Sequence, residues 1–301
     1  MVDFTLGVRK IQREQYHADP CPTPSLSSST IHKVLRSPRH AWCSHPRLGR
    51  MADDDQDVRA SLGTIAHSIL LEGDESSVVV IDAPDYRTKD AKAARDNAWA
   101  NGDHPILAHQ LRDVRLMVEE ARVFLDSAQL LKEWNNCAAE EAVFWQEGGT
   151  YCRGLLDKRG EHYIFDYKTT QNARPESWIR NQLVNNGYDV QAAWYMRGLA
   201  KVEAINPATS NFAFLVQEIT EPYACSLIGL SPAMEALGTQ KIEKALKLWR
   251  DCLASGQWPA YSHEIAWAEP LPWHTASFEE RAAMDEMADE MLPGVAESLR
   301  D

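Results

Sequence analysis

Three strand-like segments in the middle of the chain constrain its fold most strongly. Aromatic and aliphatic residues, which favour strands, dominate EEAVFWQ (140–146), YCRGLLDK (151–158) and YIFDYKTT (163–170). The linkers EGGT and RGEH separate these segments, and their glycines are typical of tight turns. We therefore predict a β-meander, in which each strand pairs with the next one along the chain.

Helical and strand-like patterns alternate on both sides of this meander. Further strands are expected in SVVVID, SNFAFLVQEI and YACSLIGL. A helix is expected in LSSSTIHKVLR, with Ser27 or Ser28 as its cap and an end at Ser37, before Pro38, and another in VRASLGTIAHSILLE, before Gly73. Residues 88–127 are expected to form two helices, with a break around Asn101-Gly102 and a restart at Pro105. Residues 175–203 are also expected to form two helices, with Pro175 in the first turn and Gly187 between them, and a last helix is expected in 231–254. This order predicts one α/β domain with a central mixed sheet flanked by helices.

The charge of the chain is acidic and unevenly distributed. It has 31 basic and 44 acidic residues, a net charge of -13, which excludes a protein that coats a polyanion non-specifically. It leaves open a nucleic-acid enzyme whose carboxylates hold metal ions. Residues 1–50 carry a balance of +5 and residues 263–301 a balance of -8. In the acidic end, Ser277 and Glu280 have capping-box spacing, which predicts the start of an amphipathic helix.

The sequence lacks the features that characterise several classes of protein. No apolar run approaches the roughly 18–20 residues that span a bilayer, and the first residues contain no apolar signal region. We therefore expect a cytoplasmic protein with no membrane partner. The six cysteines form no CxxC pair, so they are interpreted as reduced thiols, and the GxGxxG, P-loop and GxSxG motifs are missing.

The third strand-like segment carries the candidate chemistry. Asp166 and Lys168 are two residues apart on a strand, so their side chains share a face, while Tyr167 points away. Pairing with the preceding strand would bring Asp157 close to Asp166. Two converging carboxylates suit Mg²⁺ or Mn²⁺, and a neighbouring lysine can orient a water or stabilise charge on a reacting phosphate. This set is the minimum for phosphodiester hydrolysis.

Further candidates lie in three other segments. His67 lies on an otherwise apolar helix, where a buried structural histidine is the simpler alternative. Gln191 and Tyr195 are four residues apart and share one helix face. Glu140 or Glu141, at the start of the first strand of the meander, could reach the same sheet edge. Each feature alone is weak evidence for a functional site, and it is their order along the chain that distinguishes such a site from a chance pattern.

This order resembles that of the PD-(D/E)XK nuclease superfamily, in the branch of RecB-like and phage recombination exonucleases. The nearest resemblance is to the nuclease domain of exodeoxyribonuclease VIII (RecE-type). LGTIAHSILLE is similar to its Gly-x-x-x-His helix, YCRGLLDK and FDYKTT to its catalytic strands, and YDVQAAWY to its Gln-x-x-x-Tyr helix. The resemblance covers residues 26–275 and implies a restriction-endonuclease-like core, with an N-terminal extension at 1–25 and an acidic helix or tail at 276–301.

The resemblance also implies roles for individual residues. Asp157, Asp166, His67 and the backbone carbonyl of Tyr167 would bind the metal ion, and Lys168 would be the catalytic lysine. Glu140, by its distance from Trp145, matches the family glutamate better than Glu141. Gln191 and Tyr195 would position the lysine, the substrate or the phosphate. Leu156 replaces the proline-like residue that the family has before its first aspartate, at a position that varies. Candidates for phosphate contacts are Arg36, Arg39, Arg87 and Lys89.

The activity implied is that of an Mg²⁺-dependent exonuclease, in which Mn²⁺ would substitute. It would resect linear double-stranded DNA 5′→3′ and leave a 3′ single strand for recombination with a single-strand annealing partner. Relatives form rings, so a homo-oligomer in the cytoplasm of a bacterial host is expected.

Two alternatives stay open at this point. One is a RecB-like or Cas4-like repair nuclease of other polarity or with endonuclease activity, although a Cas4-type cluster needs four suitably placed cysteines. The other is an inactive DNA-binding assembly subunit, which the complete set of Asp157, Asp166 and Lys168 disfavours.

Overall fold

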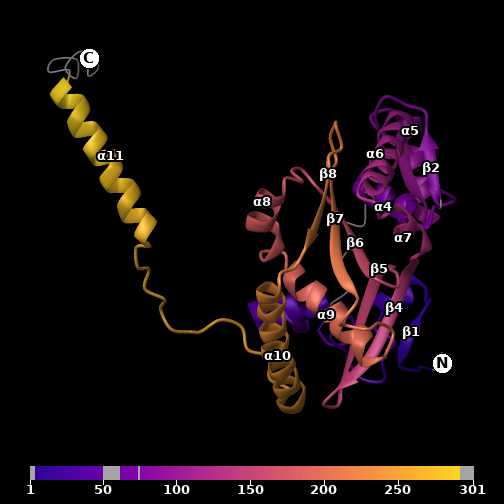
Figure 1. Cartoon of the computed structure of the whole chain (residues 1–301), viewed down its shortest axis with the longest axis horizontal. Helices are drawn as coiled ribbons and strands as arrows, with labels where there is room; N and C mark the ends of the chain where they lie inside the picture. Colours follow the sequence, from indigo (N-terminus) through magenta and orange to yellow (C-terminus); the bar gives the residue numbers. More distant parts are fainter. Residues whose placement is uncertain (1–3, 50–61, 74, 292–301) are drawn as a thin grey trace. The chain divides into compact units, whose positions relative to one another are not determined.

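The computed structural model describes residues 4–49, 62–73 and 75–291, and the chain forms two compact units, Met1–Ala260 and Tyr261–Asp301 (Figure 1). The first unit contains all of the candidate site residues. Within the described residues, no helix has the length and the apolar character that crossing a membrane requires.

A six-stranded mixed sheet forms the centre of the first unit, as predicted. Its strands run in the order β1 (Gly7–Arg9), β4 (Ala138–Glu147), β5 (Thr150–Arg159), β6 (Tyr163–Thr170), β7 (Asn211–Glu218) and β8 (Cys225–Gly229). All neighbours are antiparallel except β6 and β7, which are parallel. The β4–β5 turn is built on Gly148 and Gly149, which both have positive φ angles. The β-meander prediction is confirmed.

Helices cover both faces of this sheet (Figure 1). The first face packs against a core that includes Trp145, Trp178, Trp194 and Trp249. Its helical segments are α2 (Ser28–Arg36), α3 (Pro38–Ser44), α8 (Pro175–Trp178), the π-helical turn η1 (Ile179–Leu183), α9 (Tyr188–Lys201) and α10 (Pro232–Ser255). The second face packs against α4 (Leu62–Glu72), α6 (Ala108–Ser127) and α7 (Leu131–Asn136). The site therefore lies in a sheet that two helical layers hold rigidly.

The predicted helix caps are largely confirmed. Ser27 accepts a hydrogen bond from the Thr30 amide and begins α2, which Ser37 ends. Gly73 has a φ of +69° and its amide bonds the carbonyl of Ile69, which fits the predicted end of α4. The first four residues of that predicted helix, 58–61, lie outside the described residues.

Two local predictions are wrong. Pro105 does not restart a helix: it lies in β3 (His104–Leu107), which pairs in parallel with β2 (Val78–Ile81), and α6 begins only at Ala108 after α5 (Lys89–Ala100). Proline is tolerated there because each strand of a two-stranded sheet has a free edge. Ser277 caps no helix, because α11 (Pro272–Met291) begins five residues earlier and the Ser277 hydroxyl donates to the carbonyl of His274.

The N-terminal segment (residues 4–26) is part of the first unit. β1 extends the sheet beside β4, and α1 (Arg13–His17) follows it. Phe4, Tyr16 and Cys21 pack with Phe144 of β4. Leu26 then forms a bridge to Cys152 of β5. The segment is thus fixed to the strands that carry the site.

Candidate active site

The site lies where β5 and β6 separate. Their pairing reaches only as far as Lys158 opposite Phe165, so Asp157 and Asp166, the next residues outward, lie at the mouth of the fork. The backbone amide of Tyr167 donates to Asp157 Oδ2 at 2.8 Å. A carboxylate therefore satisfies an amide that the diverging strands leave without a ladder partner.

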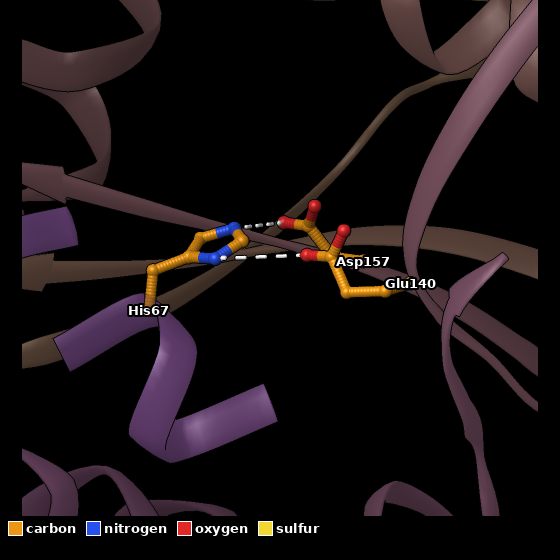
Figure 2. Close-up of side chains that lie close together, drawn as sticks. All are labelled: His67, Glu140 and Asp157. Carbon is orange, nitrogen blue, oxygen red and sulfur yellow. Dashed lines mark ion pairs between the residues drawn. The ribbon is translucent and has the colours of Figure 1, made fainter. Parts of the chain in front are cut away.

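Helix α4 brings His67 to this fork. Gly63 allows the approach, because a β-carbon on it would overlap the hydroxyl of Thr169 on β6. One turn later, His67 Nε2 lies 3.1 Å from Asp157 Oδ2 and Nδ1 lies 3.8 Å from Glu140 Oε1 (Figure 2). The glycine and the histidine of the Gly-x-x-x-His segment thus act together.

The two candidate glutamates have different surroundings. Glu140 points toward His67 and Asp157 (Figure 2), whereas Glu141 accepts a hydrogen bond from Arg159 Nε at 2.8 Å. Glu140 has a φ of +51°, a left-handed conformation that is uncommon for a residue with a β-carbon. Backbone strain of this kind persists where the surrounding structure imposes it, often at a functional site.

His67, Glu140 and Asp157 form a donor cluster that could hold a metal ion. One nitrogen or oxygen from each lies within 4.8 Å of the others, and all three residues are partly buried. Two carboxylates and one imidazole suit a divalent ion such as Mg²⁺ or Mn²⁺.

The electrostatics of the donor cluster fit a cation. Burial raises the pKa of Asp157, but the charges of His67 and Lys168 and the Tyr167 amide outweigh it and hold this pKa below its usual range. Burial lowers the pKa of His67, yet Asp157 and Glu140 reverse the effect and raise it. The two carboxylates thus favour positive charge at this point, and a metal ion bound by the neutral ring would supply the same counter-charge.

Asp166 organises the second half of the site. Its carboxylate forms an ion pair with Lys168 Nζ and accepts a hydrogen bond from Gln191 Nε2 at 2.8 Å. The same Gln191 nitrogen lies 3.2 Å from the hydroxyl of Tyr195. Burial and the charge of Asp157 raise the pKa of Asp166 to about 7. Lys168 Nζ also lies 4.9 Å from the centre of the Tyr188 ring, within the range of a cation–π interaction.

The structure brings most of the predicted site residues together. Seven of the predicted side chains form one continuous group: His67, Glu140, Asp157, Asp166, Lys168, Gln191 and Tyr195. The Tyr167 side chain points to the other face of the sheet from Asp166 and Lys168, into the core beneath α4, where its hydroxyl donates to Gln217 and its ring centre lies 6.0 Å from that of His67. Arg36, Arg39, Arg87 and Lys89 lie exposed on α2, on α3 and around the start of α5, so their contacts with DNA stay a prediction. Sequence reasoning missed the contributions of Gly63 and Tyr188, although both lie inside the quoted motifs.

Comparison with known proteins agrees with this geometry. Residues 27–269 match the model of a family described as a PDDEXK-like domain of unknown function (DUF3799). No curated protein matches the chain. The crystal structure of a putative exonuclease from Eubacterium rectale superposes with a TM-score of 0.56 at 11% identity, over 89% of this chain and 98% of that one.

At such low identity the superposition shows a common fold, and it confirms the predicted restriction-endonuclease-like core. The family match is independent of it and spans most of the chain. The chain therefore belongs to the DUF3799 family of PDDEXK-like domains.

Proposed function

We propose that this protein is a divalent-metal-dependent exonuclease that hydrolyses linear double-stranded DNA. The observation that carries the proposal is the donor cluster of His67, Glu140 and Asp157 beside the Asp166–Lys168 ion pair, at the fork of the central sheet. Metal ligands and a positioned lysine at one point are what phosphodiester hydrolysis needs. Mg²⁺ is the proposed ion, with Mn²⁺ as a substitute, because carboxylate oxygens predominate in the site.

The bound metal ion would polarise a phosphoryl oxygen and lower the pKa of a water. Lys168, held between Asp166 and the Tyr188 ring, is placed to orient that water and to stabilise negative charge on the phosphate. Attack of the water oxygen on phosphorus breaks the bond to the leaving sugar oxygen, which takes up a proton. Gln191 fixes the Asp166 carboxylate, and Tyr195 supports Gln191.

The finer details of the proposal rest on the resemblance to RecE-type enzymes. These details are 5′→3′ polarity, a 3′ overhang for recombination by strand annealing, a ring-shaped homo-oligomer and a place in the bacterial cytoplasm. The E. rectale protein of the same fold is described as a putative exonuclease, which is consistent with digestion from ends. A RecB-like nuclease of other polarity is the second candidate, while the intact site disfavours an inactive subunit.

Digestion of end-labelled linear duplex in Mg²⁺ tests the proposal. We expect wild-type protein to release nucleotides, a chelator to stop it, and Asp157→Asn and Lys168→Ala to lose at least about 100-fold in rate. Separate 5′ and 3′ labels report polarity, and a covalently closed circle should resist digestion. Cleavage of the circle would indicate an endonuclease, and equal activity of the variants would refute the assignment of the site.

A further inference from the structure

The chain between β6 and α9 leaves the site and then returns to it. It passes through α8 and the π-helical turn η1, and residues 179–187 form what we call the π-turn segment. Trp178, just before this segment, and Tyr188, just after it, stack with their ring centres 5.3 Å apart and their planes 8° from parallel. Lys168 Nζ lies 4.9 Å from the centre of the Tyr188 ring. The two ends of the π-turn segment therefore stack on each other next to Lys168.

The π-turn segment is held firmly at its base. Gly187 has a φ of +71°, and a β-carbon on it would lie 2.5 Å from His32 Nδ1, so the chain reverses in close contact with α2. Leu183 is buried in the core. Along the turn, the side-chain amide of Asn185 donates to the carbonyl of Asn181 at 3.0 Å. The exposed side chains are thus presented from a fixed support, which lowers the entropy lost when a ligand binds them.

Two aliphatic side chains of this segment are exposed to solvent. Ile179 and Val184 are 40% and 39% exposed. A π-helical turn is closed by bonds between residues five apart, so these two side chains lie on the same side of the turn. Short stretches of π-helix are frequent at functional sites. The pair therefore forms a small apolar surface beside the site that is open to a ligand.

The charge of the same region fits a polyanionic ligand. Residues 177–188 contain no aspartate or glutamate, although the whole chain has 44 of them and a net charge of -13. The neighbouring Arg174 pairs with Glu176 at 3.0 Å, whereas Arg180, which is exposed, has no acidic partner among the residues that the structure describes. A nucleic-acid strand can therefore approach Lys168 along the π-turn segment without repulsion from the segment itself.

We propose that the π-turn segment binds the end of the DNA duplex, with Ile179 and Val184 against the face of the terminal base pair and Arg180 on a backbone phosphate. The inference rests on the proposed function and names the feature of the substrate that this surface recognises. A duplex end exposes the apolar face of its last base pair, which a closed circle keeps stacked, and proteins pack aliphatic side chains on unstacked base faces. A guanidinium presents a planar fork of donors that matches phosphate oxygens.

The rival explanation is that a protein surface, such as that of a second copy of the chain, covers Ile179 and Val184. The two explanations differ in what Ile179→Ser/Val184→Ser changes. A protein contact predicts a change of oligomeric state, measured by sedimentation velocity, with DNA affinity unaltered. A contact with the DNA end predicts the oligomeric state of the wild type and a loss of affinity for ends.

Fluorescence anisotropy measures the contact, with a labelled blunt-ended duplex in Ca²⁺, used in place of Mg²⁺ to slow cleavage. We expect Ile179→Ser/Val184→Ser to weaken binding of the linear duplex about tenfold and to leave competition by a closed circle of the same sequence unchanged. Arg180→Gln should flatten the slope of log K against log salt by about 0.9 for the linear duplex.

A matched control removes two exposed aliphatic side chains from the other face of the sheet. Leu116 and Val123 of α6 are 40% and 54% exposed, and Leu116→Ser/Val123→Ser should bind linear duplex like the wild type. An equal loss of affinity in this control and in Ile179→Ser/Val184→Ser would overturn the inference.

Each further outcome also decides the inference. Wild-type affinity for ends in Ile179→Ser/Val184→Ser overturns it, and so does an equal loss of affinity for linear and circular DNA. Wild-type protein that binds no duplex overturns it too. If wild-type protein binds ends without cleaving them and the double variant loses that affinity, the end contact stands while the proposed catalysis fails. Where the double variant melts well below the wild type, the salt slope of Arg180→Gln, a surface substitution, decides instead.

Discussion

At the scale of single residues, two adjacent glutamates give a matched pair of variants. Glu140→Gln removes a charge from the donor cluster, whereas Glu141→Gln removes one from the pair with Arg159. We expect Glu140→Gln to weaken Mn²⁺ binding by at least about 10- to 100-fold, measured by isothermal titration calorimetry, and Glu141→Gln to bind normally. Equal losses in both variants would mean that general negative charge holds the ion, and not the geometry of the cluster.

Sequence reasoning could place some of these residues, but it favoured Glu140 over Glu141 only through the family resemblance. Strand alternation is local, so it predicts that Asp166 and Lys168 share a face, and the ion pair between them follows. The choice of Glu140 depends on a positive φ angle that tertiary packing imposes. The position of the N-terminal segment was equally out of reach, because residues far apart in sequence, Asp19, His45 and Arg153, fix it.

At the scale of elements, the position of α4 depends on one missing β-carbon. In Gly63→Ala the new methyl group would overlap the Thr169 hydroxyl, so α4 must move away from β6 and take His67 with it. We expect a loss of about 1–3 kcal/mol in the free energy of unfolding, measured with urea, and weaker Mn²⁺ binding.

A second substitution tests whether this steric contact is the cause. Thr169→Ala removes the overlapping hydroxyl, so the double variant should regain most of the Mn²⁺ affinity that Gly63→Ala loses. Gly229→Ala is the control, because its added β-carbon would make only an ordinary contact, 3.5 Å from the carbonyl of Phe212. No recovery in the double variant would place the defect elsewhere in α4.

Whether an element could be predicted likewise depends on whether its cause is local or non-local in the sequence. The strands of the meander were predictable because their composition and glycine turns are local signals. β3 was missed because its strand character comes from parallel pairing with β2, about 25 residues earlier in the chain, which outweighs the helix-start signal of Pro105.

At the scale of the whole molecule, the net charge of -13 is divided between the two units. Residues 261–301 account for -8 of it, with ten acidic and two basic residues. The first unit is therefore much closer to neutral, and part of its acidity is the donor cluster itself. A local cation such as Lys168 then matters more for an approaching phosphate than the overall sum does.

The stability of the whole fold should depend on pH through the buried polar network of Asp19, Ser25, His45 and Arg153, which anchors the N-terminal segment. The amide of Arg47 donates to His45 Nδ1 at 3.2 Å, and Nε2 lies 3.1 Å from the Ser25 carbonyl. This arrangement requires a neutral ring with its proton on Nε2. Burial, the largest effect, lowers the pKa of His45, and Arg153 and Arg47 add to it against the opposing charge of Asp19.

The sign of the pH effect follows from this shift. In the unfolded chain His45 titrates near 6.5, so below that pH the unfolded state binds more protons than the folded state, and stability falls as the pH falls. We expect His45 to contribute a slope of at most about 1.4 kcal/mol per pH unit between its folded pKa and pH 6.5.

Urea unfolding of wild type and His45→Gln between pH 5 and 8 measures it. The variant should be less stable at pH 8, where the network is intact in the wild type, and the gap should narrow toward pH 5. A constant gap would mean that the imidazole stays neutral in both states, and a gap that widens toward pH 5 would mean that Asp19 holds the ring protonated in the fold.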